Sequence, residues 1–135
     1  MKKIVLLSMI LLTTGFCEDL FELGLEAYNK SEFDKAAKQW QKACDDNVAR
    51  ACHNLGFLYE DAQGVKQDYS KSAELYEKAC NNGYNRGCFN LGAFYLKGKG
   101  AKQDYHIAKE YFGESCDLGH QNGCDAYKKL NEKGF

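Results

Sequence analysis

The sequence lacks an excess of positive charge, and it lacks the paired-histidine motifs of zinc hydrolases. Its 18 lysines and arginines are offset by 19 acidic residues, which gives a formal net charge of -1. A nucleic-acid-binding domain requires a basic patch or stripe, so the composition argues against a nucleic-acid partner. No H-x-H or H-E-x-x-H motif occurs, because His53, His106 and His120 are scattered along the chain. The sequence therefore predicts no metal and no other cofactor.

Long apolar runs are also lacking, apart from a short one at the N-terminus. Two lysines precede an apolar segment at residues 4–12, which is too short to span a bilayer and is typical of a signal peptide. Cleavage after Cys17 would remove residues 1–17. The alternative is a lipoprotein with an acylated Cys17, although Phe16 stands where that processing favours a small residue. We expect a secreted or periplasmic protein that has no membrane contact once the signal peptide is removed.

Cysteine is almost absent outside one regular pattern. An exported chain enters an oxidising compartment, where an even set of evenly spaced cysteines indicates disulfides. Residues eight apart in one unbroken helix are separated by about 12 Å, beyond the roughly 7 Å limit for bridged α-carbons, so the helix must break between them. A zinc site is the alternative, but zinc sites favour C-x2-C pairs over C-x7-C. The predicted bridges are Cys44–Cys52, Cys80–Cys88 and Cys116–Cys124.

The chain repeats itself with a period of 36 residues. This shift aligns Asn54 with Asn90 and Gly56 with Gly92, and it places the run K-Q-D-Y at residues 66–69 on the same run at 102–105. Such self-similarity is the signature of a repeat architecture.

Each repeat is predicted to contain two helices, of which the first runs through residues 51–62 and the second through residues 68–80. Asp68 and Asp104 stand where N-caps of the second helices are expected, and Gly83 and Gly119 stand where helices would end in a left-handed cap. One helix pair cannot bury its apolar face alone, so the units must stack into an all-α solenoid.

The repeat pattern resembles a known family. N-L-G-x-x-Y, a glycine-containing loop, D-Y and then S/A-x-x-x-Y/F before a cysteine resemble the Sel1-like branch of the tetratricopeptide repeats. The C-x7-C staple resembles the Helicobacter cysteine-rich protein (Hcp) family of exported Sel1-like repeat proteins. This resemblance implies a right-handed α/α solenoid of helix pairs stapled by disulfides. The expected organisation is a signal peptide at residues 1–17, a tetratricopeptide-like repeat at 18–44, Sel1-like repeats at 45–80 and 81–116, and a C-terminal capping helix at 117–135.

Two stacked polar pairs are the candidate ligand-binding residues. Arg50 and Asn54 are four residues apart on a first helix, hence on one face, and Arg86 with Asn90 repeats them one unit later. In tetratricopeptide domains that bind peptide carboxylates, an asparagine before L-G and a basic residue one turn earlier line the concave groove, and these four residues match those positions. The acidic Glu22 would confine anion binding to the second and third units. The alternative is a structural role, in which these side chains are solvated or join neighbouring units.

Two functions remain open at this stage. The first is a binding module for a peptide, a peptidoglycan fragment or a protein partner. The second, implied only by the resemblance to the Hcp family, is a penicillin-binding protein that slowly hydrolyses β-lactams. Whether the chain is an enzyme stays undecided, because its catalytic residues would be unknown: the sequence contains no S-x-x-K, S-D-N or K-T-G motif of serine β-lactamases.

Overall fold

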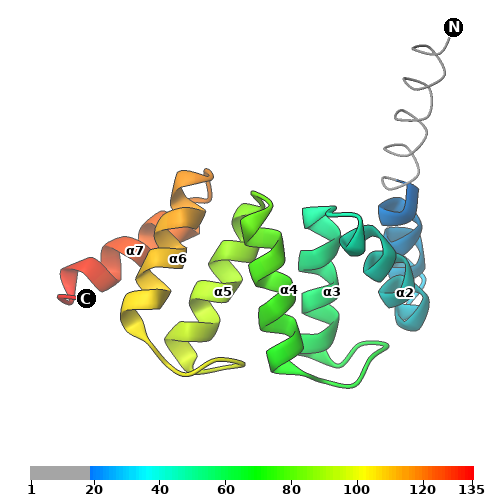
Figure 1. Ribbon diagram of the computed structural model, residues 1–135, viewed down its shortest axis with the longest axis horizontal. Coiled ribbons are helices and arrows are strands. Elements are labelled where there is room, and N and C mark those ends of the chain that lie inside the picture. The colour runs from blue at the N-terminus through cyan, green and yellow to red at the C-terminus, as the bar shows by residue number, and fades with distance from the viewer. Residues whose placement is uncertain (1–18) are drawn as a thin grey trace, which may run out of the picture.

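A computed structural model describes residues 19–135, and in this range the chain is helical throughout, with short connections (Figure 1). Successive helices follow one another along the longest axis of the molecule, so the all-α solenoid expected from the repeat is confirmed. The predicted signal peptide and its cleavage after Cys17 lie outside the described residues. Residues 19–29 are helical, and the later helices are α2 (Phe33–Asp45), α3 (Ala49–Asp61), α4 (Tyr69–Asn81), α5 (Asn85–Lys97), α6 (Tyr105–Asp117) and α7 (Gln121–Glu132).

The ends of the second helices are specified by single residues. The side chains of Asp68 and Asp104 accept hydrogen bonds from backbone N–H groups in the first turns of α4 and α6, so both predicted N-caps are confirmed. Gly83 and Gly119 follow the same helices with φ values of 86° and 92°. Asn47 takes the equivalent place after α2 with a φ of 64°, since asparagine tolerates this conformation better than most residues.

The long loop of each Sel1-like unit packs against the unit before it. Gly64 and Gly100 both have positive φ, 69° and 68°. A Cβ added to Gly64 would lie 2.3 Å from the carbonyl carbon of Phe33, and one added to Gly100 would lie 2.3 Å from the carbonyl oxygen of Tyr69. These loops therefore need glycine for their conformation and for their close approach to the second helix of the preceding unit.

Close packing within each unit also depends on glycine. A Cβ on Gly56 would lie 2.9 Å from the ring of Tyr76, and one on Gly92 would lie 2.8 Å from the ring of Phe112. Both rings are buried. The hydroxyl of Ser72 also donates to the carbonyl oxygen of Gly56 at 2.7 Å, which ties α4 to α3. The L-G of each repeat thus lets the second helix pack closely against the first.

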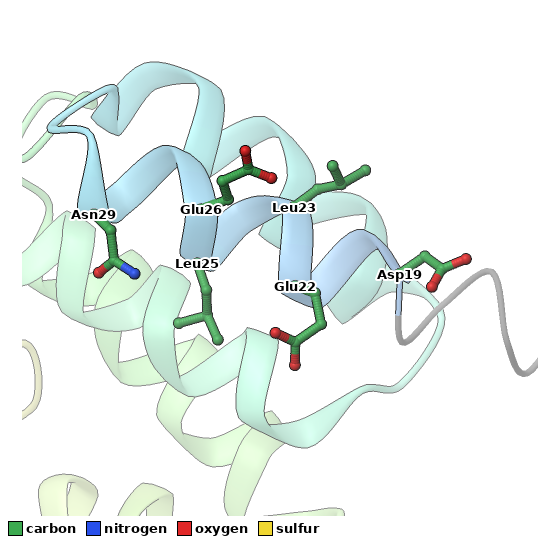
Figure 2. A pocket seen from close by; sticks show the side chains of 6 residues that line it. All are labelled: Asp19, Glu22, Leu23, Leu25, Glu26 and Asn29. Carbon is green, nitrogen blue, oxygen red and sulfur yellow. The ribbon is translucent and has the colours of Figure 1, made fainter.

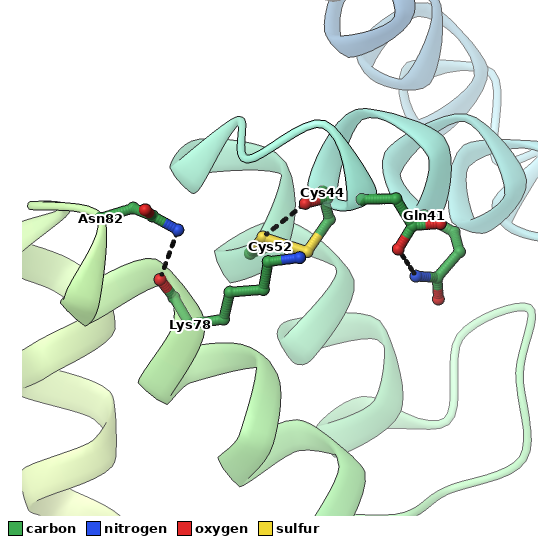
Figure 3. The surroundings of a disulfide bond; sticks show 6 residues. Gln41, Cys44, Cys52, Lys78 and Asn82 are labelled. Atoms are coloured by element: carbon green, nitrogen blue, oxygen red, sulfur yellow. Dashed lines mark hydrogen bonds between the residues drawn. A yellow bond between two sulfur atoms is a disulfide. The ribbon is translucent and has the colours of Figure 1, made fainter.

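Three disulfides close the turns between units. Each joins cysteines eight residues apart, with α-carbons separated by 4.6 Å. Figure 3 shows one bridge between the end of α2 and the first turn of α3, with Lys78 of α4 beside it. The helix breaks between the paired cysteines as the spacing required. The bridges are Cys44–Cys52, Cys80–Cys88 and Cys116–Cys124.

The last helix, α7, differs from α3 and α5 at the position where those helices pack against the second helix of their own unit. Lys128 of α7 stands at the repeat position of Gly92, where a side chain would collide with a following second helix. The ammonium of Lys109 instead donates to Asn131 Oδ1 at 2.9 Å, which joins α6 to α7. None of the helices within residues 19–135 combines the length and the apolar character needed to cross a membrane.

Candidate functional site

The four residues predicted to bind a ligand lie on the first helices of adjacent units. Their spacing places them, together with the residues one turn further on, along one face of α3 and one face of α5. Both arginines are exposed and both asparagines are partly buried. We call this surface the first-helix face, made by Arg50, Asn54 and Phe57 of α3 and by Arg86, Asn90 and Ala93 of α5.

His53 connects the two asparagines. Its Nε2 lies 3.0 Å from Nδ2 of Asn90, and its Nδ1 lies 3.2 Å from Oδ1 of Asn54. An amide nitrogen can only donate, so Nε2 accepts and Nδ1 carries the proton that is donated to Asn54. The neutral imidazole therefore makes both hydrogen bonds and links α3 to α5.

Burial lowers the pKa of His53 from its usual value of 6.5, and the charge of Arg86 acts in the same direction, while the hydrogen bond to Asn54 opposes them. The ring packs against Tyr76 and Tyr84, with centroid separations of 5.5 Å and 5.1 Å. His53 is thus held neutral among aromatic rings near neutral pH. The sequence does not predict these hydrogen bonds, although Phe89 at the equivalent position of the next unit marks His53 as an exception in the repeat.

The two asparagines differ in what they can offer a ligand. Asn90 donates to His53. It also lowers the pKa of the buried Tyr76 phenol, although burial, the largest cause, raises that pKa overall. Asn54 uses only its Oδ1, because its Nδ2 has no hydrogen-bond acceptor among residues 19–135. Asn54 therefore keeps amide donors for a ligand, while Asn90 is already an inter-unit hydrogen-bond partner.

The arginines are positioned by different neighbours. The guanidinium carbon of Arg50 lies 4.2 Å from the ring centroid of Phe21, which holds Arg50 over the helix at residues 19–29. Arg86 lies close enough to His53 for its charge to affect the imidazole. The first-helix face therefore carries two cations beside a chain of amide and imidazole hydrogen bonds, an arrangement that can bind a carboxylate or an amide.

Two small pockets adjoin the first-helix face. The first pocket, of about 230 Å³, is lined by Leu25, Tyr28, Trp40, His53, Asn54 and Phe57. The second pocket, of about 210 Å³, is lined by Glu60, Phe89, Asn90, Ala93, Phe94, Lys97 and Lys99. Each pocket is lined by one of the two asparagines, whereas Arg50 and Arg86 line neither of these two pockets.

A larger hollow, of about 660 Å³, is a poor candidate for a site. All six residues that line it belong to the helix at residues 19–29. Figure 2 shows that Glu22, Leu25 and Asn29 point to one side of this helix, whereas Leu23 and Glu26 point to another. Side chains that diverge from one helix cannot surround a ligand.

Two of the four described serines are engaged in structural hydrogen bonds. Ser72 and Ser115 are buried, and their hydroxyls donate to the carbonyl oxygens of Gly56 and Asn85 at 2.7 Å and 2.9 Å. Both serines therefore join helices. Ser31 and Ser70 are exposed at the ends of helices.

The one group of potential metal ligands in residues 19–135 contains a disulfide. Glu114 Oε2 lies 3.3 Å from Sγ of Cys80, and Cys88 completes the group. Because these two cysteines are bonded to each other, neither sulfur is a thiolate that could hold zinc. The cysteines thus serve as the staples that the spacing predicted.

The Sel1 repeat family matches residues 49–84 and 85–120, which together make up more than half of the chain. Both matches begin at the first residue of a first helix, α3 or α5.

Curated relatives of the chain come from Helicobacter pylori. "Putative beta-lactamase HcpE" is 41% identical over 46 residues, a match that takes in 34% of this chain and 13% of that protein. "Putative beta-lactamase HcpC" is 40% identical over 50 residues, which is 37% of this chain and 17% of that protein. The chain therefore spans less than a fifth of the length of these relatives.

Solved structures share the fold. A protective antigen of uropathogenic Escherichia coli with an SLR fold has a TM-score of 0.84 and 25% identity, over 91% of this chain and 27% of the antigen. A Sel1 repeat protein from Oxalobacter formigenes has a TM-score of 0.77 and 26% identity, over 87% and 91% of the two chains. Helicobacter pylori cysteine-rich protein B has a TM-score of 0.66 and 27% identity, over 81% and 92%.

Proposed function

Because this chain belongs to the Sel1 repeat family, we propose that it is an exported binding module that holds a peptide, a peptidoglycan fragment or a protein partner along its first-helix face. Sel1 repeat proteins generally mediate protein–protein interactions. The observation that carries the proposal is that the Arg50/Asn54 and Arg86/Asn90 pairs share one face of two first helices, and that each asparagine lines a pocket beside that face. A carboxylate bound along this face would meet charged donors, and a peptide carbonyl would meet the unused Nδ2 of Asn54.

An extracytoplasmic location is indicated by the three disulfides and by the Hcp relatives. We infer that the chain reaches this location by export, in the periplasm or outside the cell. Ligands met there include cell-wall peptides and the termini of other exported proteins, and both carry carboxylates.

A calorimetric titration tests this proposal. An acidic peptide and a muropeptide are titrated into the oxidised protein and into the double variant Asn54→Ala/Arg86→Ala. A charge-assisted hydrogen bond contributes roughly 1.5 to 3 kcal/mol, so the variant is expected to bind at least tenfold more weakly. Lys102→Ala serves as the control, because it removes one exposed positive charge at a residue that lines neither pocket.

Circular dichroism melts accompany the titration. Unchanged affinity with unchanged stability would move the site elsewhere. A large loss of stability in the double variant would show that these side chains hold the repeats together.

Hydrolysis of β-lactams is suggested by the names of the relatives, and a penicillin belongs in the same titration. The buried Ser72 and Ser115 both donate to backbone carbonyls, so we expect binding or slow turnover that no single serine controls. Complete loss of hydrolysis on one Ser→Ala change would identify a nucleophile and replace the binding proposal.

A further inference from the structure

The first pocket has an apolar floor. Trp40 is 2% exposed, and its indole nitrogen already donates to the carbonyl oxygen of Phe21 at 3.2 Å. The ring therefore presents only apolar atoms to the pocket. Leu25 and Phe57 form apolar walls, while Asn54 contributes the polar edge. Such a pocket fits an apolar side chain better than a charged one.

Phe57 lies in this pocket without being part of a packed core. Its side chain is partly exposed, and it does not belong to the core clusters of residues 19–135 or to the side chains packed against them. An apolar side chain that is left half-exposed beside a hollow gains burial when a ligand covers it.

The second pocket has a different chemistry, because it contains two ammonium groups and one carboxylate. Lys99 is already engaged, since its Nζ lies 3.5 Å from Glu60 and 4.5 Å from the ring centroid of Tyr69. Lys97 is exposed in the last turn of α5. The pocket therefore keeps a net positive charge, and the ammonium of Lys97 is available to an anionic ligand.

The two pockets lie one unit apart on the same surface. Asn54 lines the first and Asn90 the second, and His53 bonds to both asparagines. Packed helices lie about 8–10 Å apart. A peptide extended in the polyproline II conformation advances about 3.1 Å per residue and returns its side chains to the same side every third residue. Side chains about three residues apart in an extended ligand would therefore reach the two pockets.

We propose that the first-helix face selects an extended peptide with an apolar side chain for the first pocket and a carboxylate about three residues away for the second. This inference rests on the proposed function and names its ligand class. The carboxylate can come from an aspartate or glutamate side chain or from the end of a chain, because the chemistry of the second pocket is the same for all of them.

Fluorescence anisotropy with synthetic peptides tests the proposal. The probes are labelled Gly/Ser peptides that carry one phenylalanine and one glutamate at spacings of one to five residues. A second set replaces the glutamate with a free C-terminal carboxylate, and its amidated counterpart lacks that charge. Binding is expected to peak near a spacing of three and to fall about tenfold when alanine replaces the phenylalanine.

Variants assign each preference to its pocket. Phe57→Ala should remove most of the preference for phenylalanine over alanine and leave the need for a carboxylate. Lys97→Ala should do the reverse, and Lys102→Ala should change neither. Circular dichroism melts verify that each variant remains folded.

The outcomes separate this inference from the proposed function. Carboxylate peptides that bind without regard to phenylalanine or spacing, or that ignore Phe57→Ala and Lys97→Ala, would overturn the inference and leave the binding module in place. Failure of every peptide and muropeptide to bind the wild-type protein would overturn both.

Discussion

His53 illustrates how one residue combines packing, hydrogen bonding and titration. Phe89 occupies the equivalent position one unit later and makes a similar edge contact, with His120 at 5.0 Å, where His53 meets Tyr84 at 5.1 Å. The ring contact is thus common to both junctions. Only at His53 does the ring also connect two amide side chains, and only there does its protonation state matter to the stack.

Acid should destabilise the protein through His53. Its pKa is lowered in the folded state, so between the unfolded value of about 6.5 and the lower folded value the unfolded chain binds more protons. The free energy of unfolding should therefore fall as pH drops below about 6.5. His53→Phe should flatten this dependence in urea denaturation, because it introduces the residue that position 89 already carries. Equal slopes for the variant and the wild type would contradict this assignment.

The reverse exchange provides the matched control. Phe89→His places an imidazole between Phe112 and His120, at a position followed by Asn90 but without an asparagine at position 126. It should steepen the loss of stability in acid, and an NMR titration of the imidazole carbons should place the His53 midpoint below 6.5.

At the scale of the elements, the loops determine how units stack. Gly64 and Gly100 place their backbones against the start of the preceding second helix, whereas a Cβ added to Gly83, also at positive φ, would meet no atom within 4 Å. The left-handed conformation therefore lets Gly64 and Gly100 contact the preceding unit, whereas at Gly83 it only ends a helix.

Alanine at these glycines separates conformation from contact. Gly83→Ala should lower the free energy of unfolding by about 1 kcal/mol, since only the left-handed conformation is penalised. Gly100→Ala should cost clearly more, because its Cβ would also collide with the carbonyl of Tyr69. Denaturant unfolding of both variants measures the difference. Equal losses would mean that the loop shifts freely and does not fix the stacking.

The sequence predicts these elements unevenly. Asp68 and Gly83 could be identified because a cap depends on residues within its own turn. The contact of Gly64 with Phe33 could not, because it joins segments from two units whose relative placement only the stack defines. The spacing of the Arg/Asn pairs predicts that they share one helix face, and their role in binding stays a prediction. The bond of Asn90 to His53 and the two pockets depend on neighbouring helices and required the structure.

For the whole molecule, the disulfides supplement a small core. Each bridge closes a loop of about nine residues, which stabilises the fold by roughly 2.5 kcal/mol in the chain-entropy model. The bridges differ in access: Cys44, Cys52, Cys80 and Cys88 are buried, whereas Cys116 and Cys124 are partly exposed near the C-terminal end.

Reduction should follow this difference in access. Under mild reductant in native buffer the Cys116–Cys124 bridge should open first, because an attacking thiolate must reach the sulfur. Alkylation followed by peptide mass mapping shows the order, and denaturant should abolish it. Simultaneous opening in native buffer, or a link between cysteines of different pairs, would contradict this arrangement. Full reduction should lower the melting temperature.

The location of the bound ligand tests the central claim, that the first-helix face is the binding surface, most directly. Backbone NMR shifts of the oxidised, isotope-labelled protein are recorded while an acidic peptide with one phenylalanine is added. We expect the largest shifts on α3 and α5, at Arg50, Asn54, Arg86 and Asn90, with little change on α4 and α6. Saturable shifts confined to the second helices would show that the ligand binds on the opposite surface, and would contradict the account.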